Sequence, residues 1–254
     1  MIKIKKKEEI EKMRRAGKAL VNVFGQVMKK VDCGVSKEEI EDYAWTLISK
    51  YGGKPSFAMV PGYEFATCLC VNEEVVHGVP DGYRLKKGDV FSMDMGIYLG
   101  GYHSDKSDTV VVCEKERGGI KRFLDKGREA LEAAINVARE GNRVGDISEA
   151  IEKVIVDEGG YEVVRSLVGH GIGRNLHEDP AIPGFLSEDK RETAELKAGM
   201  TLAIEVIYSK GSSKVKHENN DGWTLITKDK SLSGLFEDTI LVTKEKAEVL
   251  TRLN

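Results

Sequence analysis

Apolar side chains recur at steps of three and four residues in two pairs of segments, one pair in each half of the chain. In the first half this spacing runs through residues 8–30 and 36–52. The second of these segments opens with Ser36 and carries Glu39 three residues later, which is the pattern of a helix capping box. In the second half the same spacing runs through residues 120–140 and 145–159. The pattern predicts four amphipathic helices that end at glycine-rich breaks.

Short runs of β-branched and other apolar residues predict strands between and after these helices. We expect strands at 66–71, 90–95, 97–99, 109–113, 161–168, 201–208, 214–216, 223–227 and 235–242, with a hairpin turn at 100–101. Residues 55–65 and 178–198 are predicted to be loops, and residues 245–250 a short helix.

The two halves of the chain repeat each other. Gly34, Ile40 and Gly52-Gly53 recur as Gly141, Ile147 and Gly159-Gly160, all at an offset of 107 residues. Each half also carries a carboxylate six residues after a glycine, Asp94 after Gly88 and Glu205 after Gly199. The order in each half is helix, helix, strands. We therefore expect one α+β domain over residues 1–254, with pseudo-twofold halves of roughly 1–115 and 116–254. The strands would form a central antiparallel sheet with helices over one face.

Composition narrows the class of protein. The chain has 254 residues, of which 41% are hydrophobic and 32% charged, and its net charge is −3, so it offers no electrostatic footprint for DNA or RNA. Lys3 and residues 5–7 are basic, but Glu8 and Glu9 follow at once, which predicts a solvated helix start. No apolar run has the length of a signal peptide core or a membrane span.

The four cysteines also favour an intracellular protein. Cys33, Cys68, Cys70 and Cys113 form no CxxC pair, so we expect no zinc knuckle and four free thiols in a cytoplasmic protein.

A glycine-rich run at residues 169–173 holds His170, and His177 follows seven residues later. Three glycines at alternate positions permit unusual backbone angles and close approach of other groups. We expect a turning, buried loop that presents two imidazoles. An ordinary glycine-rich turn with two ordinary histidines is the alternative. A phosphate-binding loop is disfavoured because no Lys-Ser or Lys-Thr follows.

Four carboxylates need an explanation. Asp94 and Glu205 lie in apolar strands, where a carboxylate is costly unless it is paired or binds a metal. Asp105 lies in a polar stretch and Glu237 at the head of an apolar strand. The alternative for Glu205, a solvent-facing strand position, is weakened because Ala203 and Ile207 share its face. With the pseudo-twofold, the four acids would converge, and like charges so placed need cations. Carboxylates with one imidazole suit two divalent metals, which activate water for hydrolysis.

Several motifs together carry a resemblance to a known family. They are His77 within residues 71–80, the spacing of eleven from Asp94 to Asp105, the run 169–173 followed by His177-Glu178-Asp179-Pro180, and Asp221-Gly222-Trp223 before Glu237. As a set they resemble the type I methionine aminopeptidases of peptidase family M24. The match covers nearly the whole chain, and the family's pita-bread fold agrees with the internal repeat. The absence of a zinc-binding extension resembles the short bacterial form.

The resemblance implies a role for each matching residue. The metal ligands would be Asp94, Asp105, His170, Glu205 and Glu237, holding two divalent ions (Co, Mn, Fe or Zn), with Asp105 and Glu237 bridging. Glu205 would also accept the proton of the attacking water. His77 would contact the scissile amide nitrogen and His177 would stabilise the oxyanion. A histidine satisfied within its turn is the alternative for His77.

The methionine pocket is implied in the same way. Tyr63, Cys68, Leu176 and Trp223 fall where the family lines that pocket, although core packing explains Cys68 equally well. His103 and His217 have no such context and are predicted to be surface residues.

The sequence departs from the family pattern at several positions. Val206 and Asp238 stand where Pro and His are usual, and Phe57, Val60 and Leu176 stand where a smaller residue, Tyr and Phe are common. Asp238 would add negative charge near the metals if its side chain pointed that way. No metal ligand is lost.

The resemblance implies a cytoplasmic, monomeric enzyme that removes N-terminal methionine from peptides and nascent chains, with ribosome association open. We expect neither DNA binding nor membrane binding. A related Xaa-Pro peptidase is an alternative, but such enzymes generally carry a large N-terminal domain for which 254 residues leave no room. A non-catalytic module on the same fold is a second alternative, and it would be expected to lose ligands.

Overall fold

The centre of the protein is an antiparallel sheet. The computed structural model describes residues 2–218 and 221–253, and within them the strand order is β1-β4-β5-β12-β9-β7-β8, with β2 on β4, β6 on β9 and β13 on β12. These strands are β1 (Lys54–Pro55), β2 (Thr67–Val71), β4 (Val90–Leu99), β5 (Tyr102–Val111), β6 (Glu162–Val163), β7 (Val168–Gly171), β8 (Glu178–Pro183), β9 (Thr201–Ser209), β12 (Ser233–Leu241) and β13 (Glu248–Val249). A second sheet joins β3 (Glu74–Val76), β11 (Leu225–Thr227) and β10 (Val215–His217).

The four predicted helices are present. They are α1 (Lys7–Met28), α2 (Lys37–Lys50), α3 (Gly118–Val137) and α4 (Val144–Glu152), which continues as the π-helical turn η2 (Lys153–Glu158). Two short 3₁₀ turns, η1 (Phe57–Met59) and η3 (Lys190–Glu192), lie in connections. The predicted capping box opens α2, because Glu39 N–H donates to Ser36 Oγ at 3.2 Å and Ser36 N–H donates to the Glu39 carboxylate at 2.8 Å.

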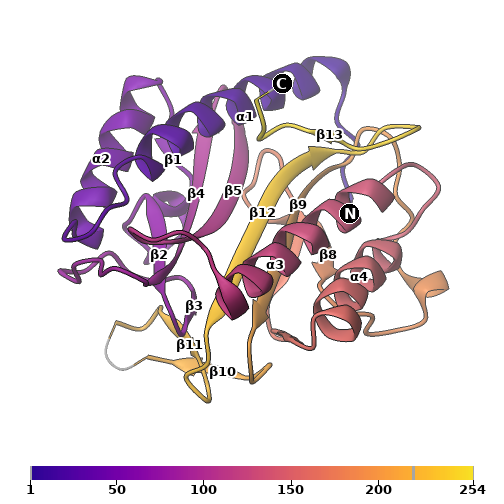
Figure 1. Cartoon of the computed structure of the whole chain (residues 1–254). Helices are drawn as coiled ribbons and strands as arrows, with labels where there is room; N and C mark the ends of the chain where they lie inside the picture. The colour runs from indigo at the N-terminus through magenta and orange to yellow at the C-terminus, as the bar shows by residue number, and fades with distance from the viewer. Residues whose placement is uncertain (1, 219–220, 254) are drawn as a thin grey trace.

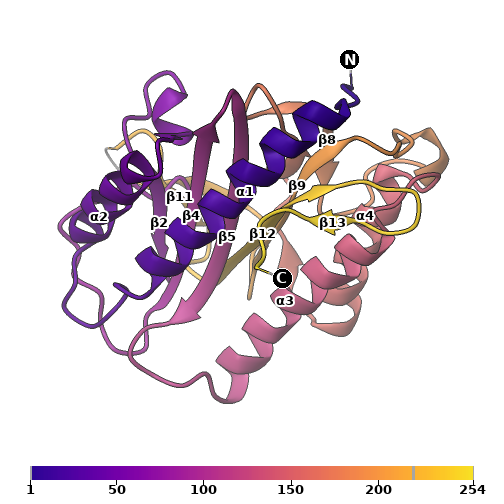
Figure 2. The same ribbon diagram turned by 90° about the horizontal axis from the view of Figure 1, so that it is seen from above.

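Each pair of helices covers its own half of the sheet. Figures 1 and 2 show α1 along β4 and β5, and α3 along β12 and β9. The first half buries an apolar cluster that includes Leu20 of α1 and Phe91 of β4. The second buries a cluster that includes Phe123 of α3 and Ile204 of β9. Burying a side chain of this size stabilises the fold by about 1.5–3 kcal/mol. The helices therefore cover one face of the sheet, and the other face remains available for a functional site.

The internal repeat of the sequence is also present in the backbone structure of the two halves. Gly34 and Gly141 both have left-handed backbone angles, φ +83° and +88°, and their N–H groups donate to the carbonyls of Leu85 and Leu196 respectively. Each of these glycines lies just before the second helix of its half, Gly34 before α2 and Gly141 before α4. The two halves meet where β5 pairs with β12. The predicted α+β fold with its central antiparallel sheet is confirmed.

Two predicted loops and one predicted helix are wrong. Val168–Gly171 is strand β7 and Glu178–Pro183 is strand β8, paired with each other, and β7 also pairs with β9. The glycines permit this close packing, because a Cβ on Gly169 would lie 2.6 Å from the Ala203 carbonyl oxygen. Residues 245–250 form no helix, since Glu248 and Val249 extend the sheet as β13 on β12.

Three side-chain predictions also fail. Cys33 and Cys113 form a disulfide rather than two free thiols, whereas Cys68 and Cys70 are free as expected. His103 is buried, with Nδ1 2.9 Å from Ser56 Oγ, rather than exposed. Lys5, predicted to be solvated, is buried. His217 is exposed as predicted.

No helix among the described residues is long and apolar enough to cross a membrane.

Candidate metal centre and substrate pocket

The alternation of side chains along β9 and β12 aims two glutamates away from the helices. Glu205 and Glu237 are opposite each other in the register of these strands. Phe236, next to Glu237, packs against Gly127 of α3, so Glu237 points to the opposite face. Val206, next to Glu205, belongs to the core beneath α3 and α4. The polar positions of an apolar strand pair are thereby brought together on the helix-free face.

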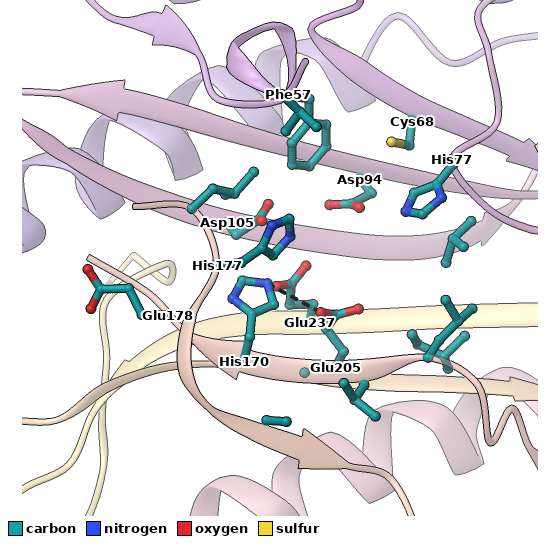
Figure 3. A pocket seen from close by; sticks show the side chains of 18 of the residues that line it. Phe57, Cys68, His77, Asp94, Asp105, His170, His177, Glu178, Glu205 and Glu237 are labelled. Carbon is teal, nitrogen blue, oxygen red and sulfur yellow. Dashed lines mark ion pairs between the residues drawn. The ribbon is translucent and has the colours of Figure 1, made fainter. Parts of the chain in front are cut away.

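The other half contributes two aspartates in the same way. Asp94 of β4 lies opposite Ser107, and Asp105 of β5 lies opposite Gly96. A Cβ at Gly96 would lie 2.7 Å from Ser56 Cβ and 3.3 Å from the Asp105 carboxylate, so glycine leaves space for both side chains. Because β5 pairs with β12, the aspartates and the glutamates face each other across the centre of the sheet (Figure 3).

His170 of β7 completes the cluster. Asp105, His170 and Glu237 each offer a ligand atom, and these atoms lie within 4.8 Å of one another. His170 Nε2 also lies 3.5 Å from Glu205 Oε1, the pair joined by the dashed line in Figure 3. His170 Nδ1 lies 2.9 Å from the Gly171 carbonyl, to which it donates, so Nε2 keeps its lone pair for a metal ion. The five predicted ligands therefore converge.

The carboxylates carry strongly shifted pKa values. Burial raises the pKa of Asp105 to about 7, and burial together with the charge of Asp105 raises the pKa of Glu205 to about 8. Burial and the neighbouring acids raise the pKa values of Asp94 and Glu237 well above their ordinary range. Burial, with a smaller contribution from His177, lowers the pKa of His170 to about 4. Acids that resist ionisation beside a neutral imidazole form a site that favours a cation.

The donor atoms fit divalent metal ions. Among the described side chains, Asp94 Oδ1 and Glu237 Oε1 are buried without a hydrogen-bond partner. Buried carboxylate oxygens are rarely left unpartnered in folded proteins. Four carboxylates and one imidazole are donors that suit divalent ions such as Mn, Fe or Co.

The two further histidines lie on the open side of the cluster. His77 follows β3 in a left-handed conformation, φ +57°, which is uncommon for a residue other than glycine. His177 precedes β8, and its ring centroid is 4.5 Å from that of His170. Both residues are solvent-exposed, and both line the same cavity (Figure 3). Although each residue is exposed overall, protein atoms displace part of the water around each imidazole. This desolvation lowers the pKa values of both histidines, so both imidazoles are neutral at pH 7.

Beside the metal cluster the cavity has an apolar wall. Its volume is about 760 Å³, and its lining includes the predicted pocket residues Tyr63, Cys68, Leu176 and Trp223, together with Phe57 and Val60. Asp221 fixes the position of Trp223 by accepting from its N–H at 2.8 Å, and the indole packs edge-on against Tyr63 with centroids 5.1 Å apart.

Other lining residues were not predicted. Val76, Ile207 and Glu178 also contribute to the cavity. Ile207 could have been found from strand alternation, because it lies two residues after Glu205 and so shares its face. Asp238 does not reach the cavity. Its carboxylate is buried on the helix side, 2.8 Å from Lys106 Nζ and 2.7 Å from Arg252 Nε.

Comparison with known proteins agrees with this geometry. The model of metallopeptidase family M24 matches residues 11–244. The chain therefore belongs to metallopeptidase family M24, a family of metal-dependent hydrolases.

Methionine aminopeptidases of other organisms match this chain over their full length. A methionine aminopeptidase of Clostridium perfringens is 39% identical over 255 residues, with 99% of both chains covered. The crystal structure of the Thermotoga maritima methionine aminopeptidase superposes with a TM-score of 0.94, 41% identity and complete coverage of both chains. Prolidase from Pyrococcus furiosus shares the fold, with a TM-score of 0.79 and 24% identity, but the chain covers only 66% of it. The resemblance to methionine aminopeptidases is confirmed, and so is the pita-bread fold.

Proposed function

We propose that this chain is a metal-dependent aminopeptidase that removes methionine from the N-termini of peptides and nascent proteins. The observation that carries the proposal is the convergence of four buried carboxylates and His170 beside a pocket with an apolar wall. Methionine suits such a pocket because its flexible, polarisable side chain adapts to irregular apolar space. The carboxylates are also natural partners for the positively charged amino group of a substrate.

The metal centre is proposed to hold two divalent ions. Asp94, Asp105, His170, Glu205 and Glu237 would hold these ions, which would be Co, Mn, Fe or Zn. When bound, such ions polarise a carbonyl and lower the pKa of water.

The chain's own groups would divide the remaining chemistry. Glu205 accepts the proton of the attacking water, because its carboxylate lines the cavity beside the proposed ligand His170, 3.5 Å from Nε2. His77 contacts the scissile amide nitrogen, and His177 donates to the oxygen that becomes negative in the transition state. Both imidazoles can donate an N–H while neutral, which is the form that their lowered pKa values favour at pH 7.

Hydrolysis by metal-stripped protein tests the proposal. The protein is reloaded with Co, Mn, Fe or Zn and given Met-Ala-Ser and Ala-Pro-Ser peptides. Metal-dependent release of methionine alone is expected. Release from the Ala-Pro peptide would instead assign the chain to the Xaa-Pro branch, and metal binding without turnover would indicate a non-catalytic module.

Paired variants locate the activity. Glu237→Gln is expected to lower turnover by on the order of 100-fold or more, since even residues behind metal ligands are worth 10–100-fold. Glu38→Gln on the exposed first turn of α2 is the matched control and should leave turnover unchanged. Equal effects of both substitutions would argue against a metal site at Glu237.

We further propose that residues 1–254 form one catalytic domain that acts as a cytoplasmic monomer, with ribosome association left open, as it is from the sequence. Light scattering of the purified protein tests the monomer, and co-sedimentation with ribosomes decides the open point. A stable dimer would contradict the proposal.

A further inference from the structure

The segment before α1 is anchored to the loop that carries His177. Lys5 N–H donates to the Gly199 carbonyl at 2.8 Å, which fixes the backbone of this segment. The Lys5 side chain then reaches Glu178, with Nζ 2.8 Å from Oε2. The two side chains are only 5% and 4% exposed. A basic residue near the start of the chain thus forms a buried ion pair with the residue that follows His177.

Glu178 is the centre of this loop. Its second oxygen accepts from the backbone N–H groups of Arg174 at 3.0 Å and Asn175 at 3.2 Å. Gly173 allows the lysine to approach, because a Cβ there would lie 2.7 Å from Lys5 Cε and 2.9 Å from Glu178 Oε1. One carboxylate therefore ties together both sides of a short loop, with Leu176 and His177 between the tied positions.

The side chains of His177 and Glu178, at the end of this loop, point in different directions. Figure 3 shows the imidazole of His177 turned toward the carboxylate cluster, whereas the Glu178 carboxylate points away from it. Burial alone would raise the pKa of Glu178, but the hydrogen bond and charge of Lys5 overcome this, and the pKa is lowered. The carboxylate is therefore ionised and depends chiefly on Lys5, since an unpaired buried charge is strongly destabilising. The second cation near it, Lys3, is exposed and lies farther away, with Nζ 3.8 Å from Oε1.

We propose that Lys5 is a positioning residue, which acts through Glu178 to hold the imidazole of His177 against the metal centre. This proposal rests on the proposed function and deepens it. Turnover would depend on Lys5, a residue that contacts neither the substrate nor the metal ions. His177 is a donor to developing charge, and a misplacement of about 1 Å costs such groups on the order of 100-fold in rate. The effect should fall on kcat rather than KM, because the donor acts chiefly in the transition state.

The kinetic test uses Lys5→Met, His177→Ala and the double variant on a Met-Ala-Ser peptide at saturating metal. We expect Lys5→Met to lower kcat by roughly 10- to 100-fold with little change in KM. In the His177→Ala background the same substitution should change kcat less than about twofold, because the group it positions is gone. Lys5→Arg should restore most of the activity. Lys7→Met, on the exposed first residue of α1, is the matched control.

A spectroscopic readout separates this proposal from the proposed function. With the five histidines labelled by ¹⁵N, the His177 imidazole resonances are assigned through His177→Ala. Lys5→Met should shift or broaden these resonances while Lys7→Met leaves them unchanged, whether or not the protein hydrolyses peptides. If Lys5→Met does not fold, Lys5→Met with Glu178→Met removes both charges together and should give the same shift.

An unperturbed His177 signal in the Lys5 variants would overturn the proposal. So would a kcat loss of equal size in the wild-type and His177→Ala backgrounds, because it would show that Lys5 acts elsewhere. Absence of methionine release by the wild-type protein would contradict the proposed function, and the resonances would still decide the role of Lys5.

Discussion

Once divalent metal has been removed with a chelator, the free energy of unfolding of the protein should fall as the pH rises from 7 to 8. Burial raises the pKa values of Asp94, Asp105, Glu205 and Glu237, and repulsion by neighbouring acids adds to this rise for all of them except Asp105. A raised pKa means that the folded protein binds more protons than the unfolded chain, whose acids ionise near pH 4. By linkage, the free energy of unfolding then falls as pH increases through the folded-state pKa values.

The size of this effect follows from two of the acids. At pH 7.5 Asp105, with a pKa of about 7, and Glu205, with a pKa of about 8, together hold about one proton. One proton corresponds to about 1.4 kcal/mol per pH unit. For 254 residues this lowers Tm by about 2–3 °C per pH unit. Asp94 and Glu237 act in the same direction and add to this slope.

The histidines determine the choice of pH window. Burial lowers the pKa values of His103 and His170 to about 4, so the folded protein binds fewer protons than the unfolded chain below about pH 6.5. Their contribution therefore rises with pH and opposes that of the acids. His77 and His177, whose pKa values are also lowered, act in the same direction as these two histidines. At pH 7.5 an unfolded-state imidazole is only about one-tenth protonated, so the acids dominate from there to pH 8.

Urea unfolding at pH 7.0, 7.5 and 8.0 in excess chelator measures the slope. With saturating Mn²⁺ the slope should reverse, because metal binding displaces protons and strengthens as pH rises. The double variant Asp105→Asn with Glu205→Gln should flatten the slope of the chelated protein. A free energy of unfolding that is constant or rises with pH in the chelated wild-type protein would refute the assignment of these proton affinities.

Three further predictions concern the scaffold. Asp238→Ala leaves the cations of Lys106 and Arg252 without their buried partner and should cost about 3 kcal/mol in urea unfolding, while metal-restored kcat stays within about twofold; a large loss of kcat in the folded variant would place Asp238 in the reaction. Gly127→Ala should lower the free energy of unfolding by about 1–3 kcal/mol, because its Cβ would overlap the Phe236 ring and lie 2.6 Å from the Tyr208 hydroxyl, and an unchanged Tm would contradict this packing. Reduction of the Cys33–Cys113 disulfide should cost about 4 kcal/mol, since it opens a loop of 80 residues, and identical unfolding curves with and without a thiol reductant would argue against the bond.

Two members of the proposed metal cluster were predictable from the local sequence because they break its pattern, whereas the full ligand set was implied by the family resemblance. Asp94 and Glu205 interrupt apolar strands, and the repeat of Gly88 and Gly199 places them at equivalent positions. The structure shows why the repeat is informative. Both glycines adopt a left-handed backbone, φ +88° and +94°, which enforces the same turn before each strand. A glycine that is needed for a left-handed turn and a carboxylate within an apolar strand can both be recognised in a single sequence.

The failed predictions depend on contacts between distant segments. The glycines of β7 suggest a loop locally, but they serve close packing against β8 and β9. His103 lies in a polar stretch, and only the fold reveals that Ser56 is its partner. Lys5 stands among exposed lysines, and nothing near it in the chain distinguishes it from Lys6 or Lys7. Its burial follows from Glu178, at a separation of 173 residues.

The symmetry of the fold separates metal binding from substrate handling. Each half gives two carboxylates to the junction of β5 and β12, so neither half alone could hold the metal centre. The two imidazoles proposed to meet the peptide have no such counterpart, since His77 follows β3 in the first half while His177 ends the loop between β7 and β8 in the second. Rigid paired strands therefore form the cation site, whereas residues outside the repeat supply the groups that would meet the peptide. Such loops lack the support of a sheet interior, which is the physical reason for an external anchor such as the ion pair between Lys5 and Glu178.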